Sequence, residues 1–350
     1  MTILRNTVVK IVKVLVLSGV LTFITGAAVL AWQWNNFISQ PIGNGTELKI
    51  IEITPGSSAN RVAWLLHQES LLSSPKWFVW YLRYLDKHLQ LKAGEIEIDP
   101  SWSVDTLIDK LIEGQTVQYP VAFIAGQTVQ ESLKMIQTLP KIKRELDLND
   151  IEGLQALLGL EGEVNSRYPY ARLEGWLLPE TYHYKAGDSD KQIILRAYAA
   201  MKTTLDQAWS NREKELPYKT PYEALIMASI VEKETGVAVE RPLISGVFVR
   251  RMRIGMRLQT DPTVIYGIGQ GYDGNIRKRD LLTTTAYNTY RINGLPPTPI
   301  ALPSKEAIEA VMHPEKTQAL YFVAKGGGEH HFSNTLIEHN RAVNKYILNR

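Results

Sequence analysis

The chain has 350 residues, of which 45% are hydrophobic and 21% are charged, and its formal net charge is +3. This composition is that of a globular protein long enough for two modest domains or one large one. The nearly balanced charge argues against a broad nucleic-acid-binding surface, so no nucleic-acid partner is expected. Because the sequence contains no cysteine, it excludes disulfides, thiolate nucleophiles, cysteine-ligated zinc and a lipidated N-terminal cysteine.

The N-terminal segment has the length and polarity of a membrane anchor. Residues 14–32 contain no charged side chain, and a helix of that length roughly spans a hydrocarbon core of about 30 Å. Positive charges precede this run at Arg5, Lys10 and Lys13, and the next one is Lys49. The positive-inside rule then places residues 1–13 in the cytoplasm and everything after a transmembrane helix at 14–34 outside the cytoplasmic membrane.

Two tryptophans, Trp32 and Trp34, fall where an interfacial aromatic anchor is expected. The alternative is a cleaved signal peptide with its small-residue site at 29–31, although signal-peptide apolar regions are usually only about 7–15 residues long. Export is predicted in either case. Residues 35–47 are polar and contain proline and glycine, which predicts a linker.

A strand–turn–helix pattern then recurs three times. In each copy an apolar strand residue (Ile53, Ile98 or Phe123) is followed five positions later by a hydroxyl residue (Ser58, Ser103 or Thr128). A hydroxyl at that position can cap the following helix, and Glu131 gives the third copy the spacing of a capping box. The pattern predicts a small α+β module over residues 48–120, with the third copy leading into a second domain over 121–350.

The module contains an aromatic-rich stretch over residues 77–84. Its large rings follow the 3–4 spacing of a helix, which predicts that they form a buried helical face rather than a sugar-stacking surface: Trp77, Trp80, Tyr81 and Tyr84. For the module as a whole, a structural spacer and a glycan-binding domain fit the sequence equally well.

The most strongly patterned helix of the second half is predicted over residues 221–235, with Thr220 as its N-cap, Pro221 at its first position and Gly236 beyond its end. Its apolar side chains are predicted to share one face, which Glu232 extends by one turn: Ala224, Leu225, Ala228 and Val231.

A carboxyl group bordering an apolar stripe is partly desolvated, which favours the protonated form that a general acid requires. By this pattern alone, Glu232 fits a solvated acid at a helix end better than a catalytic one. Glu234 is predicted to point elsewhere.

Two later loops carry polar side chains next to aromatic ones, which suits carbohydrate better than phosphate. The first contains Gln259, Thr260 and Asp261 before a proline, and the second contains Tyr287, Asn288 and Tyr290. The sequence has no P-loop, no dinucleotide-binding glycine fingerprint and no Gly-x-Ser-x-Gly nucleophile turn.

Several of these segments together resemble the YceG-like endolytic murein transglycosylase family, and their order and spacing hold over nearly the whole chain. The matching blocks are LEGW with PETY (173–176 and 179–182), ASIVEKE (228–234), RLQTDPTVIY (257–266), YNTY (287–290), GLPP (294–297), and HHFS with EHN (330–333 and 338–340).

The resemblance implies a single-pass inner-membrane protein with a LysM-like module at 48–120 and a mixed α+β catalytic domain that resembles lytic transglycosylases. It implies that Glu232 is the catalytic acid/base, which cleaves the MurNAc–GlcNAc bond of nascent glycan strands, terminates their elongation and leaves 1,6-anhydro ends. Peptidoglycan is the implied partner, with cell-wall synthases a further one, and no cofactor or metal is expected. Candidate substrate contacts are Glu174, Glu180, Gln259, Thr260, Asp261, Tyr287, Asn288 and Tyr290.

The chain departs from the family pattern at two positions. Thr298 stands where the family usually has glycine after Pro-Pro, and Ser304 replaces the glycine of a usual Pro-Gly. Both are expected to alter loop geometry and substrate affinity rather than the catalytic acid.

Three other functions compete with this one. A peptidoglycan hydrolase of lysozyme type would leave ordinary reducing ends, and a membrane-anchored glycan-binding scaffold would need no catalytic acid. A metal-dependent hydrolase would use His330, His331 and His339 with neighbouring glutamates, but the sequence has no HExxH helix.

Overall fold

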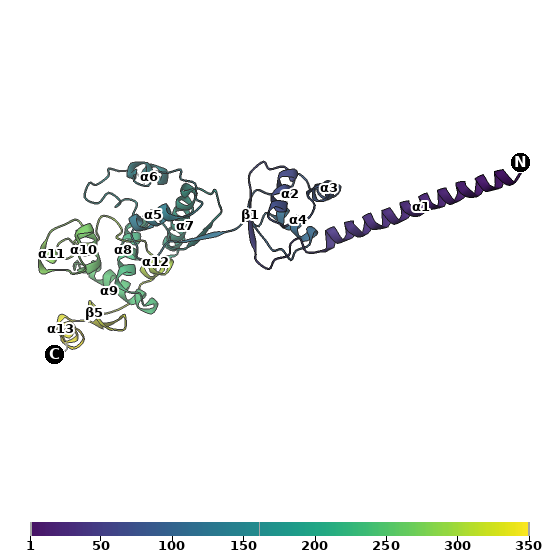
Figure 1. Ribbon diagram of the computed structural model, residues 1–350. Helices are drawn as coiled ribbons and strands as arrows, with labels where there is room; N and C mark the ends of the chain where they lie inside the picture. The colour runs from purple at the N-terminus through teal and green to yellow at the C-terminus, as the bar shows by residue number, and fades with distance from the viewer. Residues whose placement is uncertain (1, 161, 349–350) are drawn as a thin grey trace. The chain divides into compact units, whose positions relative to one another are not determined.

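The computed structural model describes residues 2–160 and 162–348. The chain divides into two compact units, Met1–Gln118 and Tyr119–Arg350, each described by itself (Figure 1). Helices and antiparallel strands occur in both, which confirms the predicted α+β class.

The first unit is a two-stranded sheet packed with helices. Strand β1 (Lys49–Ile53) pairs antiparallel with β2 (Gly94–Ile98), so that Ile51 faces Ile96 across the ladder. The helices are α1 (Thr2–Ser39), α2 (Ala59–Gln68), α3 (Pro75–Tyr84) and α4 (Val104–Glu113). They enclose a core of aliphatic and aromatic side chains, which includes Leu66, Phe78, Ile98 and Leu107.

Helix α1 contains the predicted membrane-spanning segment. Its portion Lys13–Ser39 is long and apolar enough to cross a membrane. The predicted linker at 35–47 is corrected by the structure, because the helix continues to Ser39 and the side chains of Phe37 and Ile42 are buried in the core of the first unit. Apolar side chains within the polar stretch explain this, since burying them stabilises the end of the helix against the unit.

The predicted helix caps are confirmed in all three repeats. Ser58 accepts a hydrogen bond from Arg61 N at 3.3 Å, and Ser103 accepts one from Thr106 N at 3.2 Å. Thr128 forms the full capping box, in which its hydroxyl accepts from Glu131 N and the Glu131 carboxylate accepts from Thr128 N.

The predicted orientation of the aromatic helix α3 is only half right, because Trp77 and Tyr81 are partly buried against the core as predicted and the other two rings are not. Its buried side chains are Phe78, Val79 and Leu82, whereas Trp80 is 57% and Tyr84 is 72% exposed. The buried face is therefore rotated from the predicted one towards Phe78 and Leu82.

The second unit is mainly helical and has two antiparallel strand pairs. Strand β3 (Tyr119–Ala122) pairs with β4 (Thr181–Tyr184), and β5 (Tyr321–Gly326) pairs with β6 (Glu329–Ser333). Its α-helices are α5 (Val129–Thr138), α6 (Ile151–Leu158), α7 (Asp190–Asn211), α8 (Pro221–Glu234), α9 (Arg241–Arg253), α10 (Asp261–Ile268), α11 (Lys278–Leu282), α12 (Lys305–Met312) and α13 (Leu336–Tyr346).

Helix α8 is the central element of this unit. It begins after the predicted cap, where Thr220 Oγ1 accepts from Glu223 N at 3.2 Å. Every residue from Ala224 to Val231 is buried, because α7, α9, α10 and α12 all pack against the helix. The single apolar face predicted for it is therefore wrong, and only its first and last turns approach solvent.

Candidate active site

Glu232 lies on the last turn of α8 and is held from one side. Its side chain is only 7% exposed. One carboxylate oxygen, Oε2, accepts two hydrogen bonds from Ser304: one from the backbone N–H at 3.0 Å and a second from the hydroxyl group. Ser304 is the N-cap of α12, and its Oγ also accepts from Ala307 N at 3.2 Å. The acid is thus tied to the start of a neighbouring helix.

The other oxygen of Glu232, Oε1, has a different environment. Arg241 Nη2 lies 3.7 Å away, at the start of α9, and no described residue donates a hydrogen bond to Oε1. The Arg241 Nε is buried and has no partner among the described residues. Oε1 is therefore the oxygen left available to exchange a proton with a substrate, with a cation beside it.

The predicted segment of Gln259, Thr260 and Asp261 contacts the same end of α8 by a hydrogen bond to Glu234. The Thr260 hydroxyl donates to Glu234 Oε1, and Thr260 N donates to Thr289 Oγ1 at 3.0 Å. Burial raises the pKa of Glu234 to about 7, against a hydrogen bond from Thr260 that lowers it. Glu234 points away from the contacts of Glu232, as predicted, but its burial was not predicted.

Asp261 and Tyr290 form a second contact at this end of the helix. The Tyr290 hydroxyl donates to Asp261 Oδ1 at 2.7 Å. Gln259 precedes them with an exposed side chain and a left-handed backbone (φ 48°). These are the predicted substrate-binding side chains that remain accessible beside α8.

Glu174 has a structural position instead. It is 1% exposed, and its two oxygens accept from Val129 N at 2.8 Å and from the Tyr266 hydroxyl at 3.3 Å. Burial raises the pKa of Glu174 to about 8. The carboxyl group joins the first turn of α5 to α10, and it offers no free oxygen to a sugar.

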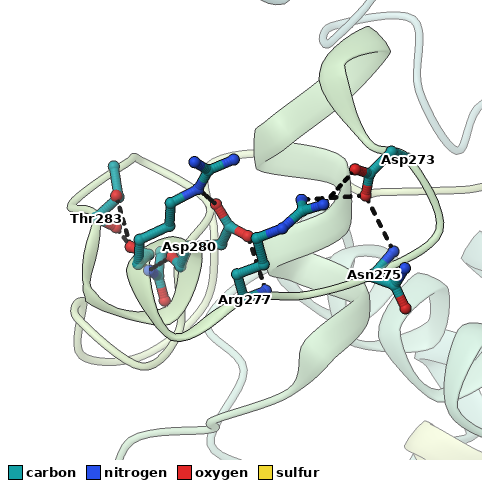
Figure 2. A network of polar contacts seen from close by, with 7 residues as sticks. Asp273, Asn275, Arg277, Asp280 and Thr283 are labelled. Atoms are coloured by element: carbon teal, nitrogen blue, oxygen red, sulfur yellow. Dashed lines mark hydrogen bonds and ion pairs between the residues drawn. The ribbon is translucent and has the colours of Figure 1, made fainter.

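Asn288 is also structural, at 1% exposure. Its side-chain amide donates to three carbonyl oxygens at the end of α11: those of Asp280 (3.1 Å), Leu281 (3.1 Å) and Thr283 (2.6 Å). Figure 2 shows the polar network of this segment, in which Arg277 binds both oxygens of Asp273 at 2.5 and 3.2 Å. The amide nitrogen of Asn288 is thus used within the protein, and its position does not support the predicted substrate contact.

Tyr287 and Glu180 do not join the end of α8. Tyr287 is 1% exposed, its hydroxyl lies 2.7 Å from Thr298 Oγ1, and burial raises its pKa to about 12. Glu180 is exposed just before β4, where its carbonyl oxygen accepts from Phe123 N at 3.1 Å. No hydrogen bond connects either residue to Glu232.

A cavity of about 600 Å³ opens near the other end of α8. Its wall contains Tyr222 of the first helical turn, which stacks on Trp176 with ring centroids 5.8 Å apart. Tyr287 and Thr298 also line it. Tyr222 precedes Glu232 by ten helical positions, so about 15 Å along the helix axis separates them. The aromatic wall is suited to sugar rings.

The two departures from the family pattern lie at opposite ends of this helix. Thr298 binds Tyr287 and lines the cavity, whereas Ser304 contacts the carboxylate of Glu232 directly. Ser304 was expected to affect only its loop, but it contacts the carboxyl group of Glu232 itself. Sequence reasoning missed the contacts of Ser304 and Arg241 with Glu232, because they depend on how α9 and α12 pack against α8 and leave no local pattern.

The histidines do not converge. His330 Nδ1 lies 2.8 Å from Glu240 Oε2, His339 stacks on Tyr321, and His331 packs against Tyr346. Across residues 2–160 and 162–348, no group of three or more His, Asp or Glu side chains is arranged to hold a metal ion.

Comparison with known proteins agrees with this architecture. A family model described as the YceG-like family matches residues 51–345. The endolytic murein transglycosylase of Bacillus subtilis (strain 168) is 30% identical over 333 residues, covering 91% of each chain. The protein of the same name from Streptococcus pneumoniae serotype 2 is 28% identical over 87% of this chain, which spans 59% of that relative's length.

Among solved structures, the crystal structure of a yceG-like protein from Listeria monocytogenes is 32% identical to this chain. It superposes with a TM-score of 0.55 and covers 85% of this chain and 99% of its own. The chain therefore belongs to the YceG-like family.

Proposed function

We propose that this chain cuts peptidoglycan glycan strands internally between MurNAc and GlcNAc, with Glu232 as its single acid/base, while anchored in the cytoplasmic membrane. Its curated relatives are endolytic murein transglycosylases, and the chain is accordingly a lytic transglycosylase, a class of lyase. The observation that carries the assignment is the asymmetric setting of Glu232, in which Ser304 holds one oxygen and the other faces Arg241.

In the first half of the reaction, Glu232 Oε1 donates a proton to the oxygen that links MurNAc to GlcNAc. The bond from C1 of MurNAc to this oxygen breaks, and its electron pair stays with the leaving oxygen. In the second half, Oε1 takes the proton of the MurNAc C6 hydroxyl, whose oxygen bonds to C1 and closes a 1,6-anhydro ring. No water is consumed, and the acid ends in its starting protonation state.

One carboxyl group suffices for this reaction because the nucleophile belongs to the substrate. A retaining glycosidase needs a second carboxylate about 5 Å from its acid, but an intramolecular hydroxyl is already held near the reacting carbon. The two hydrogen bonds from Ser304 keep Oε2 from exchanging the proton. Arg241 stabilises the negative charge that Glu232 carries between the two steps.

Glu174 and Glu234 of this unit have raised pKa values, but neither is placed as well as Glu232. Glu174 is buried, with both oxygens bound to α5 and Tyr266. Glu234 is bound to Thr260. Gln259, Asp261 and Tyr290 are the side chains we assign to substrate binding, because they remain accessible beside the same helix end.

The long apolar helix α1 supports our assignment of the protein to the membrane, where the glycan strands are made. We assign residues 1–13 to the cytoplasm and both folded units to the outside, with strand elongation ended by the cut. Cell-wall synthases are the protein partners that such a location favours. We further assign the module at 48–120 to the LysM-like class, because its two strands and capped helices form a small domain with its own core.

Mass spectrometry of muropeptides released by the purified full chain tests the reaction class. We expect new MurNAc ends that are lighter by one water than ordinary reducing ends. Ordinary reducing ends would instead identify a hydrolase of lysozyme type, and the release of no fragments would favour a glycan-binding scaffold.

A further inference from the structure

Helix α3 of the first unit carries an exposed aromatic pair that is not part of the hydrophobic core of the unit. The rings of Trp80 and Tyr84 stack with centroids 5.7 Å apart and planes 10° from parallel. They are 57% and 72% exposed. Large exposed aromatic side chains that gather on one face mark an interaction surface.

This pair is connected directly to the end of the membrane-spanning helix. The Trp34 ring of α1 packs edge-on against Trp80 at 5.0 Å and against Tyr81 at 5.3 Å. Trp77 lies 5.9 Å from the same ring. The first unit is therefore packed against α1 at Trp34, and this contact fixes the height of α3 along α1.

The length of α1 fixes that height relative to a bilayer. A hydrocarbon core of about 30 Å takes about 20 helical residues, which places the outer boundary near Trp32 and Trp34 when the span begins after Lys13. Trp32 is 65% exposed, as a lipid-facing anchor would be. Because α3 contacts Trp34, it lies at the level of the lipid headgroups.

The charges on the same face of α3 fit headgroups as well. Lys76 and Arg83 are exposed and flank Trp80 and Tyr84 at helical positions i, i+4, i+7 and i+8, so all four side chains share one face. Tryptophan and tyrosine concentrate at membrane interfaces, and lysine and arginine bind lipid phosphates.

We infer that this α3 surface (Lys76, Trp80, Arg83 and Tyr84) binds the lipid headgroup layer of the outer leaflet. The inference goes beyond the proposed cleavage reaction and depends only on α1 crossing the membrane. On this inference the first unit lies in contact with the bilayer surface, instead of moving freely on a flexible linker. The helix that continues to Ser39 and the buried Phe37 support this, since they leave little slack between the span and the unit.

Spin labelling of the full chain in lipid nanodiscs tests the inference, and the absence of native cysteine makes single labels straightforward. One variant carries Tyr84→Cys on the α3 surface. The matched control carries Trp64→Cys on α2, where the native side chain is similarly exposed, at 53%. Accessibility to oxygen and to an aqueous nickel complex is then measured in nanodiscs with and without anionic lipid.

We expect the label at position 84 to be at least threefold less accessible to the nickel complex than the label at 64, and more accessible to oxygen. A label at 84 that is as water-accessible as the one at 64 would overturn the inference. So would equal lipid exposure at both positions, which would indicate unspecific contact. Protection at 84 only after peptidoglycan is added would assign the surface to glycan. None of these outcomes depends on catalysis, so this test is independent of the test of the cleavage proposal.

Discussion

Two glutamates of the second unit have opposite surroundings: Glu232 on the last turn of α8, and Glu174 in the turn at residues 173–175. Glu174 is 1% exposed, and the hydrogen bonds to its two oxygens come from different elements. Glu232 has one oxygen held by Ser304 and the other beside Arg241. Burial raises the pKa of Glu174, whereas geometry leaves an oxygen of Glu232 available for proton exchange. A raised pKa therefore identifies a buried carboxyl group without making it catalytic.

The largest expected effect comes from Glu232→Gln, which keeps the shape of the side chain and removes the proton exchange. We expect product release to fall at least about a thousandfold, because general acid–base catalysis contributes roughly 10²–10⁴-fold. Glu234→Gln is the matched control two residues away, and its rate is expected to fall less than tenfold. Release of anhydro-muropeptides from purified sacculi measures both. Equal losses in the two variants would contradict the difference drawn between these carboxyl groups.

Asn288→Ala is expected to reduce stability strongly, because it removes the buried amide group that three carbonyl oxygens share. A loss of about 3 kcal/mol in the free energy of unfolding is the size expected for a broken buried network. Calorimetric unfolding of the full chain measures it. An unchanged unfolding temperature together with weakened substrate binding would return Asn288 to the substrate-contact role.

Glu174→Gln is expected to change how stability depends on pH. The pKa of Glu174 rises from 4.5 to about 8 on folding, so between these values the folded chain holds a proton that the unfolded chain has released. Stability then falls as pH rises towards 8, by at most about 1.4 kcal/mol per pH unit. The glutamine variant lacks this contribution, so unfolding temperatures from pH 5 to 9 should show a flatter profile. An identical slope in the two chains would contradict the buried, protonated state.

Much of the fold could be predicted from local sequence. The contacts around α8 are an example of what could not. The caps at Ser58, Ser103, Thr128 and Thr220 depend on residues three positions away, so short patterns revealed them. The contacts of Glu232 with Ser304 and Arg241 depend on how α8, α9 and α12 pack, which no periodicity encodes. The buried face of α3 was predicted only in part for a related reason, since spacing alone does not say which of two apolar faces meets the core.

Ser304→Gly tests the hydroxyl that holds Glu232, and its expected effect is the smallest. Glycine keeps the backbone N–H bond to Oε2 and is a tolerable N-cap, so stability should change by only a few tenths of a kcal/mol. Activity should fall about tenfold, because the carboxylate loses a charge-assisted hydrogen bond.

The matched control is Ser189→Gly, which removes the cap of α7 in the same unit, where Gln192 N donates to Ser189 Oγ at 3.3 Å. It should also change stability by only a few tenths of a kcal/mol, but leave activity unchanged. If Ser304→Gly retains full activity as well, Ser304 is only a helix cap.

The most direct measurement is digestion of purified peptidoglycan by the wild-type chain in water enriched in heavy oxygen. If Glu232 acts alone and the MurNAc C6 hydroxyl closes the ring, the new MurNAc ends contain no solvent oxygen. Heavy oxygen at those ends would show that water is the nucleophile, and a second catalytic group would then have to be found beside Glu232.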